Sequence, residues 1–513
     1  MVFFSASIGG KMSAETKISL AEKIKMARTV QPVWAAYPYR KRAAHLKKSA
    51  KYLGAHIDEI TEIIHRENGK VKLDALAAEV LPAIMGIGYY IGQGKRFCSP
   101  RSISGGNLLM FNKQSRFIYK PYGVIGIISP WNYPFAIPFS EVVMALLAGN
   151  AVILKVASDT PGVGRALESV FGAAELPAGL FNYIEMPGKE AGPAFIEGGV
   201  DKLCFTGSTA TGKELMALAA PKLLPLVLEL GGADAAIICD DADLDRAARG
   251  VLWAGFSNTG QSCGGAQRIL VHQRVYQPFL EKLCAMVKAL KAGGDAELGP
   301  MTTLRQKAAV QRQIDACLAA GAKIAAQSGG EISSPEPGTE DRFLPAMVLT
   351  DVKPDMPVMT DEIFGPVVAV VPVKDDEEAV RIANASNYGL TGSVWSGNSR
   401  RAKRLAAAVN AGAVMINDHL MSHGLAETPW GGFGASGLGR THGELGFREM
   451  LKTKVVVNDI LPGVKKDLFW HPYTEKVYRG IRAITEVLGG QKAGSRLKAL
   501  FGVLRIFFRY WEK

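Results

Sequence analysis

Two side chains of this sequence have the chemistry of a covalent enzyme. Cys263 stands among small residues in the string Asn-Thr-Gly-Gln-Ser-Cys. Glu229 lies 34 positions earlier and precedes a Gly-Gly pair. A thiolate can attack an electrophilic carbon, and a carboxylate can activate water against the adduct. Asn132, in Pro-Trp-Asn-Tyr-Pro, completes the candidate set of Cys263, Glu229 and Asn132.

The other reactive side chains have ordinary interpretations. A free cysteine is most often a buried core residue, and we assign that role to Cys98, Cys204, Cys239, Cys284 and Cys317. No Cys-x-x-Cys pair occurs, and a long chain with few cysteines favours a reducing compartment over a disulfide framework or structural zinc. His419 and His423 lie four positions apart without an evident third ligand, so no metal site is expected.

The elements that must position these side chains alternate between helices and strands. Apolar residues at three- and four-residue spacing predict helices at 18–35, 43–64 and 71–91. A strand at 123–129, a helix at 137–148 and a strand at 151–156 form a βαβ unit, which implies a parallel sheet. A further strand is expected at 202–205, with a helix after it at 207–220. A second α/β region follows Glu229 to about residue 443, with strands at 235–239, 268–271 and 367–372.

Length and charge limit the classes of function. A chain of 513 residues exceeds one compact core, so two or more domains are expected. The net charge is +12, but residues 461–513 hold eleven Lys and Arg against four Asp and Glu. The remainder is only mildly basic, so no nucleic-acid partner is expected. The first residues, 1–5, have neither a basic region nor a long apolar stretch, which predicts a cytoplasmic protein without a signal peptide.

Six motifs in one order resemble the aldehyde dehydrogenase superfamily over roughly residues 20–458. They are Pro-Trp-Asn-Tyr-Pro (130–134), Phe-Thr-Gly-Ser-Thr (205–209), Glu-Leu-Gly-Gly (229–232), Gly-Gln-Ser-Cys (260–263), Glu-Ile-Phe-Gly-Pro (362–366) and Pro-Trp-Gly-Gly-Phe (429–433). The resemblance implies an α/β fold with a Rossmann-like coenzyme domain, an α/β catalytic domain and a small oligomerisation hairpin.

The expected domains follow from that resemblance. They are a coenzyme-binding domain (14–102 and 123–230), a catalytic domain (231–443), an oligomerisation segment (103–122 and 449–459) and a basic amphipathic extension (460–513). Strand pairing between subunits through the oligomerisation segment would give a homodimer or a homotetramer.

The family mechanism assigns roles to the candidate set. Cys263 attacks an aldehyde, and the Asn132 side chain with the Cys263 backbone N–H stabilises the oxyanion. One such donor contributes about 3–4 kcal/mol. Glu229 then directs water at the thioester. Because relatives that transfer the acyl group to coenzyme A commonly lack this Glu, its presence favours hydrolysis to a free acid.

The coenzyme is expected to be NAD or NADP. The string Gly207-Ser208-Thr209-Ala210-Thr211-Gly212-Lys213-Glu214 resembles a phosphate-binding loop, but Glu214 stands where Ser or Thr must bind magnesium. The resemblance instead places the N-terminus of the following helix at the pyrophosphate. It implies coenzyme contacts from Trp131, Lys155, Gly207, Ser208, Glu362 and Phe364.

Ser158 departs from the family pattern in an informative way. NAD-specific relatives often carry Glu three positions after the Lys, here Lys155, and that Glu would repel a 2′-phosphate. Two unit charges about 4 Å apart cost about 1–4 kcal/mol at effective dielectrics of 80 to 20. Ser158 removes this repulsion and can donate a hydrogen bond, so NADP acceptance is predicted. Asp159 would oppose it if its side chain turned inward.

The C-terminal extension has two interpretations. Residues 495–512 form a helical pattern with one narrow polar stripe, made of Ser495, Lys498, Gly502, Arg505, Arg509 and Glu512. Such an apolar helix must bury most of its surface. It either lies in a membrane interface, as a basic stripe with aromatic flanks allows, or docks on the enzyme or on a partner subunit.

The sequence therefore predicts an NAD(P)-dependent oxidation of an aldehyde to a carboxylic acid. Trp-Asn-Tyr-Pro-Phe (131–135) and the C-terminal helix resemble fatty-aldehyde members, which favours a medium- or long-chain aliphatic aldehyde. One alternative is an NADP-dependent succinic semialdehyde dehydrogenase, because Lys-Val-Ala-Ser (155–158) also resembles such enzymes. The other is a non-catalytic binding or scaffold protein on the same fold.

Overall fold

The computed structural model describes residues 19–103, 110, 112–293, 296–329, 332–333, 338–461, 463–491 and 493–511. Residues 14–18 of the expected coenzyme domain, part of the expected oligomerisation segment and Glu512 lie outside these ranges. The chain forms two compact units, Met1–Ser99 with Tyr119–Lys452, and Pro100–Ile118 with Thr453–Lys513.

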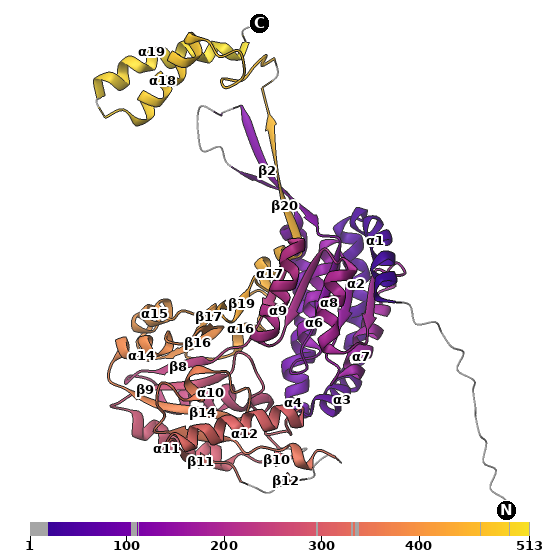
Figure 1. Cartoon of the computed structure of the whole chain (residues 1–513), viewed down its shortest axis with the longest axis vertical. Coiled ribbons are helices and arrows are strands. Elements are labelled where there is room, and N and C mark those ends of the chain that lie inside the picture. The colour runs from indigo at the N-terminus through magenta and orange to yellow at the C-terminus, as the bar shows by residue number, and fades with distance from the viewer. Residues whose placement is uncertain are drawn as a thin grey trace, which may run out of the picture. The chain divides into compact units, whose positions relative to one another are not determined.

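Helices begin the larger unit, as Figure 1 shows in indigo. They are α1 (Leu20–Ala36), α2 (Tyr39–Ala55), α3 (Ile57–Asn68), α4 (Lys72–Ala75), the π-helical η1 (Leu76–Val80) and α5 (Leu81–Cys98). The helices predicted at 18–35 and 71–91 are confirmed. The single helix predicted at 43–64 is wrong, because His56 leaves helical geometry (φ −122°, ψ 29°) and separates α2 from α3.

A six-stranded sheet lies at the centre of the first α/β region. Its strands run in the order β19 (Gly437–Leu438), β7 (Leu226–Glu229), β6 (Lys202–Thr206), β3 (Val124–Ile128), β4 (Ala151–Lys155) and β5 (Phe181–Ile184). Every neighbouring pair is parallel except β19 with β7. The predicted βαβ unit is confirmed as β3, the fully buried helix α6 (Ala136–Ala148) and β4.

The second α/β region is built on a seven-stranded sheet. Its order is β11 (Lys323–Gln327), β13 (Met347–Thr350), β14 (Val367–Val373), β9 (Ala266–His272), β8 (Asp234–Ile238), β16 (Thr391–Trp395) and β17 (Ala413–Ile416). Only β11 pairs antiparallel. The strands predicted at 235–239, 268–271 and 367–372 are β8, β9 and β14, which are rich in Val, Ile and Ala because both faces of this sheet are buried.

The strand order of the first sheet creates a binding crevice. The chain runs outward from β3 through β4 to β5 and then returns to β6, on the other side of β3. In open α/β sheets, ligands bind where the strand order reverses, beyond the carboxyl ends of the strands. Residues 130–132 follow β3, residues 207–208 follow β6, and Glu229 ends β7. The fold thus brings three of the six motifs to one edge.

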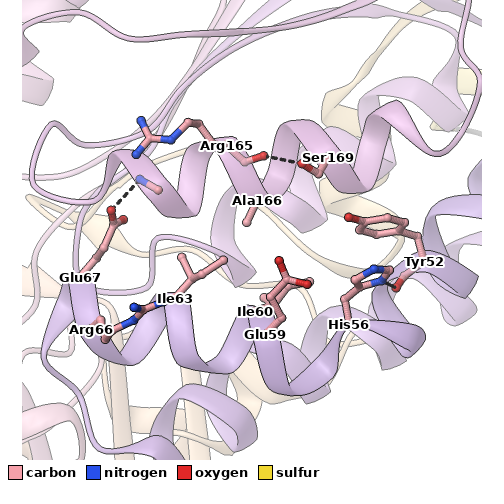
Figure 2. Close-up of a pocket in the computed structure, with 11 residues that line it drawn as sticks. Tyr52, His56, Glu59, Ile60, Ile63, Arg66, Glu67, Arg165, Ala166 and Ser169 are labelled. Atoms are coloured by element: carbon pink, nitrogen blue, oxygen red, sulfur yellow. Dashed lines mark hydrogen bonds between the residues drawn. The ribbon is translucent and has the colours of Figure 1, made fainter. Parts of the chain in front are cut away.

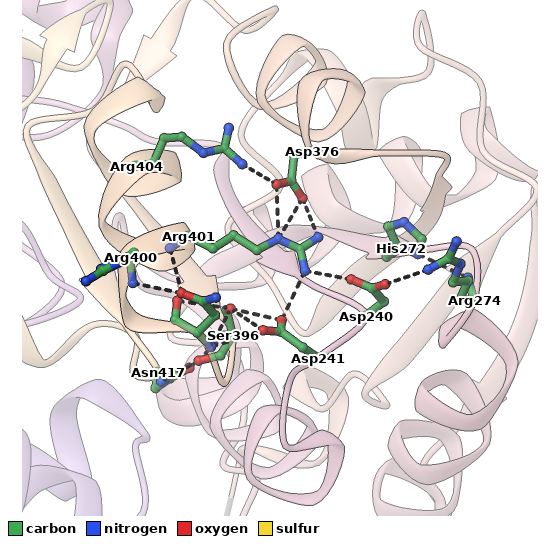
Figure 3. Close-up of polar contacts among 11 residues, drawn as sticks. Asp240, Asp241, His272, Arg274, Asp376, Ser396, Arg400, Arg401, Arg404 and Asn417 are labelled. Carbon is green, nitrogen blue, oxygen red and sulfur yellow. Dashed lines mark hydrogen bonds and ion pairs between the residues drawn. The ribbon is translucent and has the colours of Figure 1, made fainter.

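Salt bridges join segments at the carboxyl edge of the second sheet (Figure 3). Arg401 on α15 (Ser399–Ala408) binds Asp240 and Asp376 at 2.6 Å each, and Asp241 at 3.2 Å. Arg404 adds a second contact to Asp376, at the start of α14 (Asp376–Ala383). These contacts fasten α14 and α15 to the turn after β8, at the edge opposite Cys263.

The smaller unit contains an open sheet and a helical hairpin. The three-stranded sheet has the order β1 (Arg101–Ile103), β2 (Lys113–Pro121) and β20 (Leu451–Asp459), so one long edge of β20 has no partner strand among the described residues. Helices α18 (Glu475–Gly489) and α19 (Ala493–Phe507) pack on each other around Leu468, Val477, Ile484, Ile506 and Tyr510. Gly480 allows this contact, because a Cβ there would lie 2.3 Å from Ile506.

The C-terminal helix differs from its prediction at one residue, Arg509, and its exposed apolar side chains fit either interpretation. Leu497 and Phe501 remain 67% and 72% exposed, because α18 covers only one side of α19. Arg509, expected on the polar stripe, is buried instead and donates to the carbonyl oxygens of Asp467, Trp470 and Pro472. The side chains of Arg505 and Trp511 lie outside the described set.

Among the described residues, one helical stretch, Lys72–Cys98, is long and apolar enough by composition to cross a membrane. Buried core helices share that property, and Ala83, Ile87 and Phe97 of this stretch lie in the main hydrophobic core. Leu81 and Met85 on its outer side are exposed. The stretch therefore serves as a core helix with one apolar face left open.

Candidate active site

The loop that carries Cys263 has an unusual backbone. Asn258, Thr259 and Gly260 all adopt positive φ, at 49°, 54° and 68°. At Gly260 no side chain fits, since a Cβ would lie 2.2 Å from the carbonyl oxygen of Gly365. The loop then enters β9, which fixes Cys263 at the amino end of a fully buried strand. Burial raises the pKa of the Cys263 thiol well above its usual range, with a smaller contribution from Glu362.

Asn132 lies beside this loop. Its side-chain amide donates to the carbonyl oxygen of Gln261 at 3.1 Å, two residues before Cys263. The Asn132 side chain is buried and its backbone carbonyl accepts from Asn258 at 3.0 Å. The amide is therefore held at the base of the Cys263 loop by contacts on both sides.

Glu229 ends β7 within the same region. Both carboxyl oxygens are buried and have no hydrogen-bond partner among the described residues. Burial raises the pKa of Glu229 well above its usual range, and Glu141 raises it further, whereas Arg440 opposes the shift. A buried carboxyl group without partners is poised to bind water or to exchange a proton.

A cavity of about 580 Å³ lies on the coenzyme side of Cys263. It brings together most of the predicted site residues, namely Trp131, Asn132, Gly207, Ser208, Glu229, Cys263, Glu362 and Phe364. Ser208 caps the N-terminus of α9 (Thr209–Ala219), where free N–H groups favour an anion. The Trp131 and Phe364 rings meet edge to face at 5.4 Å. These donors and rings fit a dinucleotide.

Glu362 is held in this cavity by the glycines after Glu229. Its carboxylate accepts from the Gly232 N–H at 3.2 Å, and a Cβ at Gly231 would lie 2.2 Å from that carboxylate. Burial raises the pKa of Glu362 to about 8. The Gly-Gly pair is therefore required for the close approach of two chain segments.

Lys155 and Ser158 lie outside that cavity. Lys155 is buried at the end of β4, on the same carboxyl edge, and burial lowers its pKa while Asp159 raises it. The Ser158 hydroxyl is exposed and donates to the Met186 carbonyl at 3.2 Å. Asp159 is thus close enough to act electrostatically on Lys155.

A second cavity, of about 200 Å³, reaches Cys263 from the opposite side. Its walls come from the 74–85 helical stretch, the 133–137 segment at the start of α6, α10 (Leu244–Phe256), the 257–263 loop and the 420–430 loop. Its lining is mainly apolar and includes Leu81, Met85, Tyr133, Ile137, Trp253, Leu420, Met421, Leu425 and Trp430. Cys263 therefore lines both a cavity of mixed polar and apolar side chains and a mainly apolar one.

Sequence reasoning missed several residues of both cavities. Arg305, Gln306 and Arg312 on α12 (Leu304–Ala319) line the coenzyme side, and Asp74 and His423 line the apolar side. These residues belong to no short motif, so only their place in the fold reveals them. Burial lowers the pKa of His423 to about 4.

His419 also acquires a structural role. Its ring is buried between the Ser393 hydroxyl at 2.7 Å and the Gly264 carbonyl at 3.1 Å, and burial lowers its pKa to about 4. A neutral His419 thus braces the residue that follows Cys263.

A separate surface groove of about 470 Å³ lies between α3 and α7 (Pro161–Gly172), as Figure 2 shows. Glu67 points to the start of α7 and accepts from the Gly162 and Val163 N–H groups at 2.7 and 2.9 Å. Tyr52 and His56 stack at its other end, with ring centroids 3.9 Å apart. None of the predicted site residues lines this groove.

Comparison with known proteins identifies the family. Residues 4–456 match the group described as the aldehyde dehydrogenase family. The chain belongs to the aldehyde dehydrogenase family. The resemblance and the α/β fold with a Rossmann-like coenzyme region, both expected from the motifs, are thus confirmed.

Two curated relatives of this aldehyde dehydrogenase carry different substrate names. A 4,4′-diapolycopene aldehyde oxidase of Methylomonas is 33% identical, over 92% of this chain and 87% of the relative. A Mycolicibacterium smegmatis protein provisionally named an NADP-dependent succinate-semialdehyde dehydrogenase is 34% identical, over 86% and 84%. An aldehyde dehydrogenase of Bacillus cereus solved with NAD⁺ matches with a TM-score of 0.79 and 31% identity, over 86% and 88%.

The protein is accordingly an NAD(P)-dependent enzyme of the aldehyde dehydrogenase family. Membership confirms the predicted enzyme class and the predicted coenzyme, NAD or NADP. The two relatives differ in the aldehydes that they are named for, so the family does not fix the substrate.

Proposed function

We propose that this aldehyde dehydrogenase oxidises apolar aliphatic aldehydes of medium or long chain to carboxylic acids. The observation that carries the proposal is the apolar cavity that ends at Cys263. Among the described residues, no Lys or Arg lines it, and its one ionisable acid, Asp74, accepts a backbone hydrogen bond from Asn258 at 2.7 Å. A dianionic product such as succinate would lack a cation there.

In this proposal Cys263 is the nucleophile. Its thiolate adds to the aldehyde carbon, and the new oxyanion accepts from the Asn132 amide and the Cys263 N–H. To do so, the amide gives up its bond to the Gln261 carbonyl. NAD(P)⁺, when bound, would supply the acceptor for the hydride that leaves the former aldehyde carbon. Glu229 then takes a proton from water as the water oxygen adds to the thioester, and the thiolate leaves with the acid released.

We also propose the predicted coenzyme contacts as a set. Trp131, Gly207, Ser208, Glu362 and Phe364 would hold the pyrophosphate and nicotinamide ends, and Lys155 and Ser158 the adenosine end. NADP acceptance rests on the uncharged Ser158 at that end. We also propose the domain boundaries expected from the sequence.

The test of substrate class is a rate comparison. Purified protein is assayed for NADH and NADPH formation with decanal, hexadecanal, succinic semialdehyde and benzaldehyde, with Cys263→Ala as blank. Fastest turnover of the aliphatic members supports the proposal, and preference for the semialdehyde refutes it. No turnover above the blank would favour the scaffold alternative.

A matched pair of variants ties the result to the cavity. Met85→Arg adds a cation to the lining and should lower kcat/KM for decanal at least tenfold. Met26→Arg makes the same exchange at an exposed methionine of α1 and should leave kcat/KM for decanal unchanged.

We further propose that the C-terminal hairpin contacts an anionic membrane surface. Leu497, Leu500 and Phe501 form an exposed apolar stripe at helical spacing on α19, and Trp470 and Tyr478 are exposed nearby in sequence. Residues 461–513 carry a net charge of +7. Two such segments would repel each other, whereas an anionic lipid surface complements both the charge and the apolar stripe.

Vesicle sedimentation tests this second proposal. The protein should bind vesicles that contain phosphatidylglycerol more than pure phosphatidylcholine vesicles, and Leu500→Glu/Phe501→Glu should abolish the binding. Leu223→Glu, at an 88% exposed leucine of the larger unit, is the matched control. Binding that persists in the double variant would contradict the proposal.

Strand β20 supports a proposed homodimer or homotetramer. Val455, Val456 and Val457 are exposed on this edge strand, and an exposed apolar edge strand is typical of one that pairs with another chain. With the family fold, we propose a cytoplasmic enzyme that associates with the inner surface of a membrane.

A further inference from the structure

A buried ion pair lies behind the candidate oxyanion donor. Lys70 and Glu79 are both 0% exposed, and the Lys70 ammonium lies 2.7 Å from the Glu79 carboxylate. Burial lowers the pKa of Lys70, although Glu79 opposes the shift. Replacing buried ion pairs by apolar side chains is often neutral or stabilising, so stability alone does not explain this pair.

The remaining hydrogen bonds of the pair converge on one loop. Lys70 Nζ also donates to the Asn132 carbonyl oxygen at 2.7 Å and lies 4.1 Å from the centre of the Tyr133 ring. The second Glu79 oxygen accepts from the Phe135 and Ala136 N–H groups at 2.7 and 3.1 Å. The pair therefore fastens the 132–136 segment at both ends.

The same stretch also reaches the nucleophile loop. Asp74, four residues after Lys70, accepts from the Asn258 N–H at 2.7 Å. The Asn258 side chain in turn donates to the Asn132 carbonyl at 3.0 Å, the oxygen that Lys70 also binds. A single carbonyl group is thus fixed by the 70–79 stretch and by the loop that carries Cys263.

This arrangement controls the geometry that the reaction needs. The oxyanion must accept from the Asn132 amide and the Cys263 N–H together, and these donors come from two separate segments. Donors of this kind act at 2.7–3.1 Å, so a shift of a few tenths of an ångström in the 132–136 segment weakens one of the two bonds.

We propose that Lys70, supported by Glu79, is a positioning residue that sets the distance between the Asn132 amide and Cys263. The inference rests on the proposed role of Asn132. Lys70 acts through a backbone carbonyl and touches neither substrate nor coenzyme. Its loss therefore lowers catalysis only as far as Asn132 contributes to it.

A double-mutant cycle tests this dependence. Lys70→Met, Asn132→Ala and the double variant are compared with the wild type in kcat for decanal, normalised to the folded sites counted by the stoichiometry of NADPH binding. Lys70→Met should lower kcat 10- to 100-fold, with the NADPH Kd within about threefold. In the Asn132→Ala background it should lower kcat by less than about threefold. Multiplicative effects would overturn the inference.

The cycle also separates the inference from the proposed function. If Asn132→Ala leaves kcat unchanged, the oxyanion role of Asn132 fails. If Asn132→Ala is slow but Lys70→Met is not, only the positioning role of Lys70 fails.

Stability needs its own variant, because an unpaired Glu79 could unfold Lys70→Met. Lys70→Met/Glu79→Gln removes both charges and keeps an acceptor for the Phe135 and Ala136 N–H groups. Its melting temperature should lie closer to that of the wild type, while kcat stays low. Recovery of kcat together with the melting temperature would show a merely structural role.

Asn150→Ala is the matched control elsewhere in the larger unit. Asn150 is equally buried and holds Gly123 and Met450 through hydrogen bonds of 3.1 and 2.9 Å. This variant should lose thermal stability while kcat per folded site is unchanged. The contrast with Lys70→Met then isolates the effect on Asn132.

Discussion

The Asn132 amide donates to the Gln261 carbonyl at 3.1 Å, which places an oxyanion donor two residues from the candidate nucleophile. Removal of that donor should slow chemistry more than binding. We expect Asn132→Ala to lower kcat by about 10²- to 10³-fold, the usual cost of one oxyanion donor. Coenzyme binding should change little, which NADPH fluorescence titration checks. A parallel loss of coenzyme affinity would point to collapse of the loop instead.

Ser158 should govern the choice of coenzyme. Ser158→Glu places a carboxylate beside Lys155, so kcat/KM for NADP should fall about 10- to 100-fold, which corresponds to about 1.4–2.7 kcal/mol. The kcat/KM for NAD should stay within a few-fold of the wild-type value. Asp159→Asn removes the charge that acts on Lys155 and should favour NADP further. Unchanged NADP kinetics in Ser158→Glu would place the 2′-phosphate elsewhere.

Glu141 should make the protein less stable as pH rises. Burial raises its pKa to about 8, so the folded state keeps a proton that the unfolded state releases above about pH 4.5. Stability must therefore fall between about pH 4.5 and 8, by at most about 1.4 kcal/mol per pH unit. Glu141→Gln removes this dependence, and its melting temperature should gain on the wild type from pH 5.5 to pH 8. The control Glu168→Gln, on the surface of α7, should show the same change of melting temperature with pH as the wild type. If the melting temperature of Glu141→Gln also follows that of the wild type, the prediction is contradicted.

Arg401 should stabilise the second sheet by joining three carboxylates. It holds the pKa of Asp376 below its usual range, so this contribution is present above the unfolded pKa near 4 and lost as pH falls through the lower folded value. Arg401→Met should lower the free energy of unfolding by about 1–3 kcal/mol at pH 7 and by progressively less below pH 4. Arg404→Met removes a more exposed contact to Asp376 and should lower the free energy of unfolding by no more than about 1 kcal/mol. Melting temperatures at pH 7 and pH 3.5 check both values, and equal losses at the two pH values would exclude an ionic cause.

Local sequence was sufficient for the central elements and the motif residues. The run Val124–Ile128, Pro130 and the apolar helix before Gly149 each have one favourable local structure, so the βαβ unit was predictable. His56 carries no comparable signal, and the break between α2 and α3 was missed. The C-terminal pattern predicted a helix that needs an apolar partner, and within the described residues α18 covers one side of α19 while Leu497 and Phe501 stay exposed.

The sequence by itself determined the enzyme family, because residue type and short spacing place a thiol, a carboxylate and an amide in family motifs. Only the tertiary structure decided what surrounds them. The apolar wall of Met85, Trp253 and Met421 and the clamp of Lys70 on Asn132 join residues from 62 to about 340 positions apart. Such contacts follow from how sheets and helices pack, and no local pattern encodes them. The enzyme family was therefore predictable from the chain, whereas the cavity that supports the proposed substrate class and the fine positioning of the side chains required the fold.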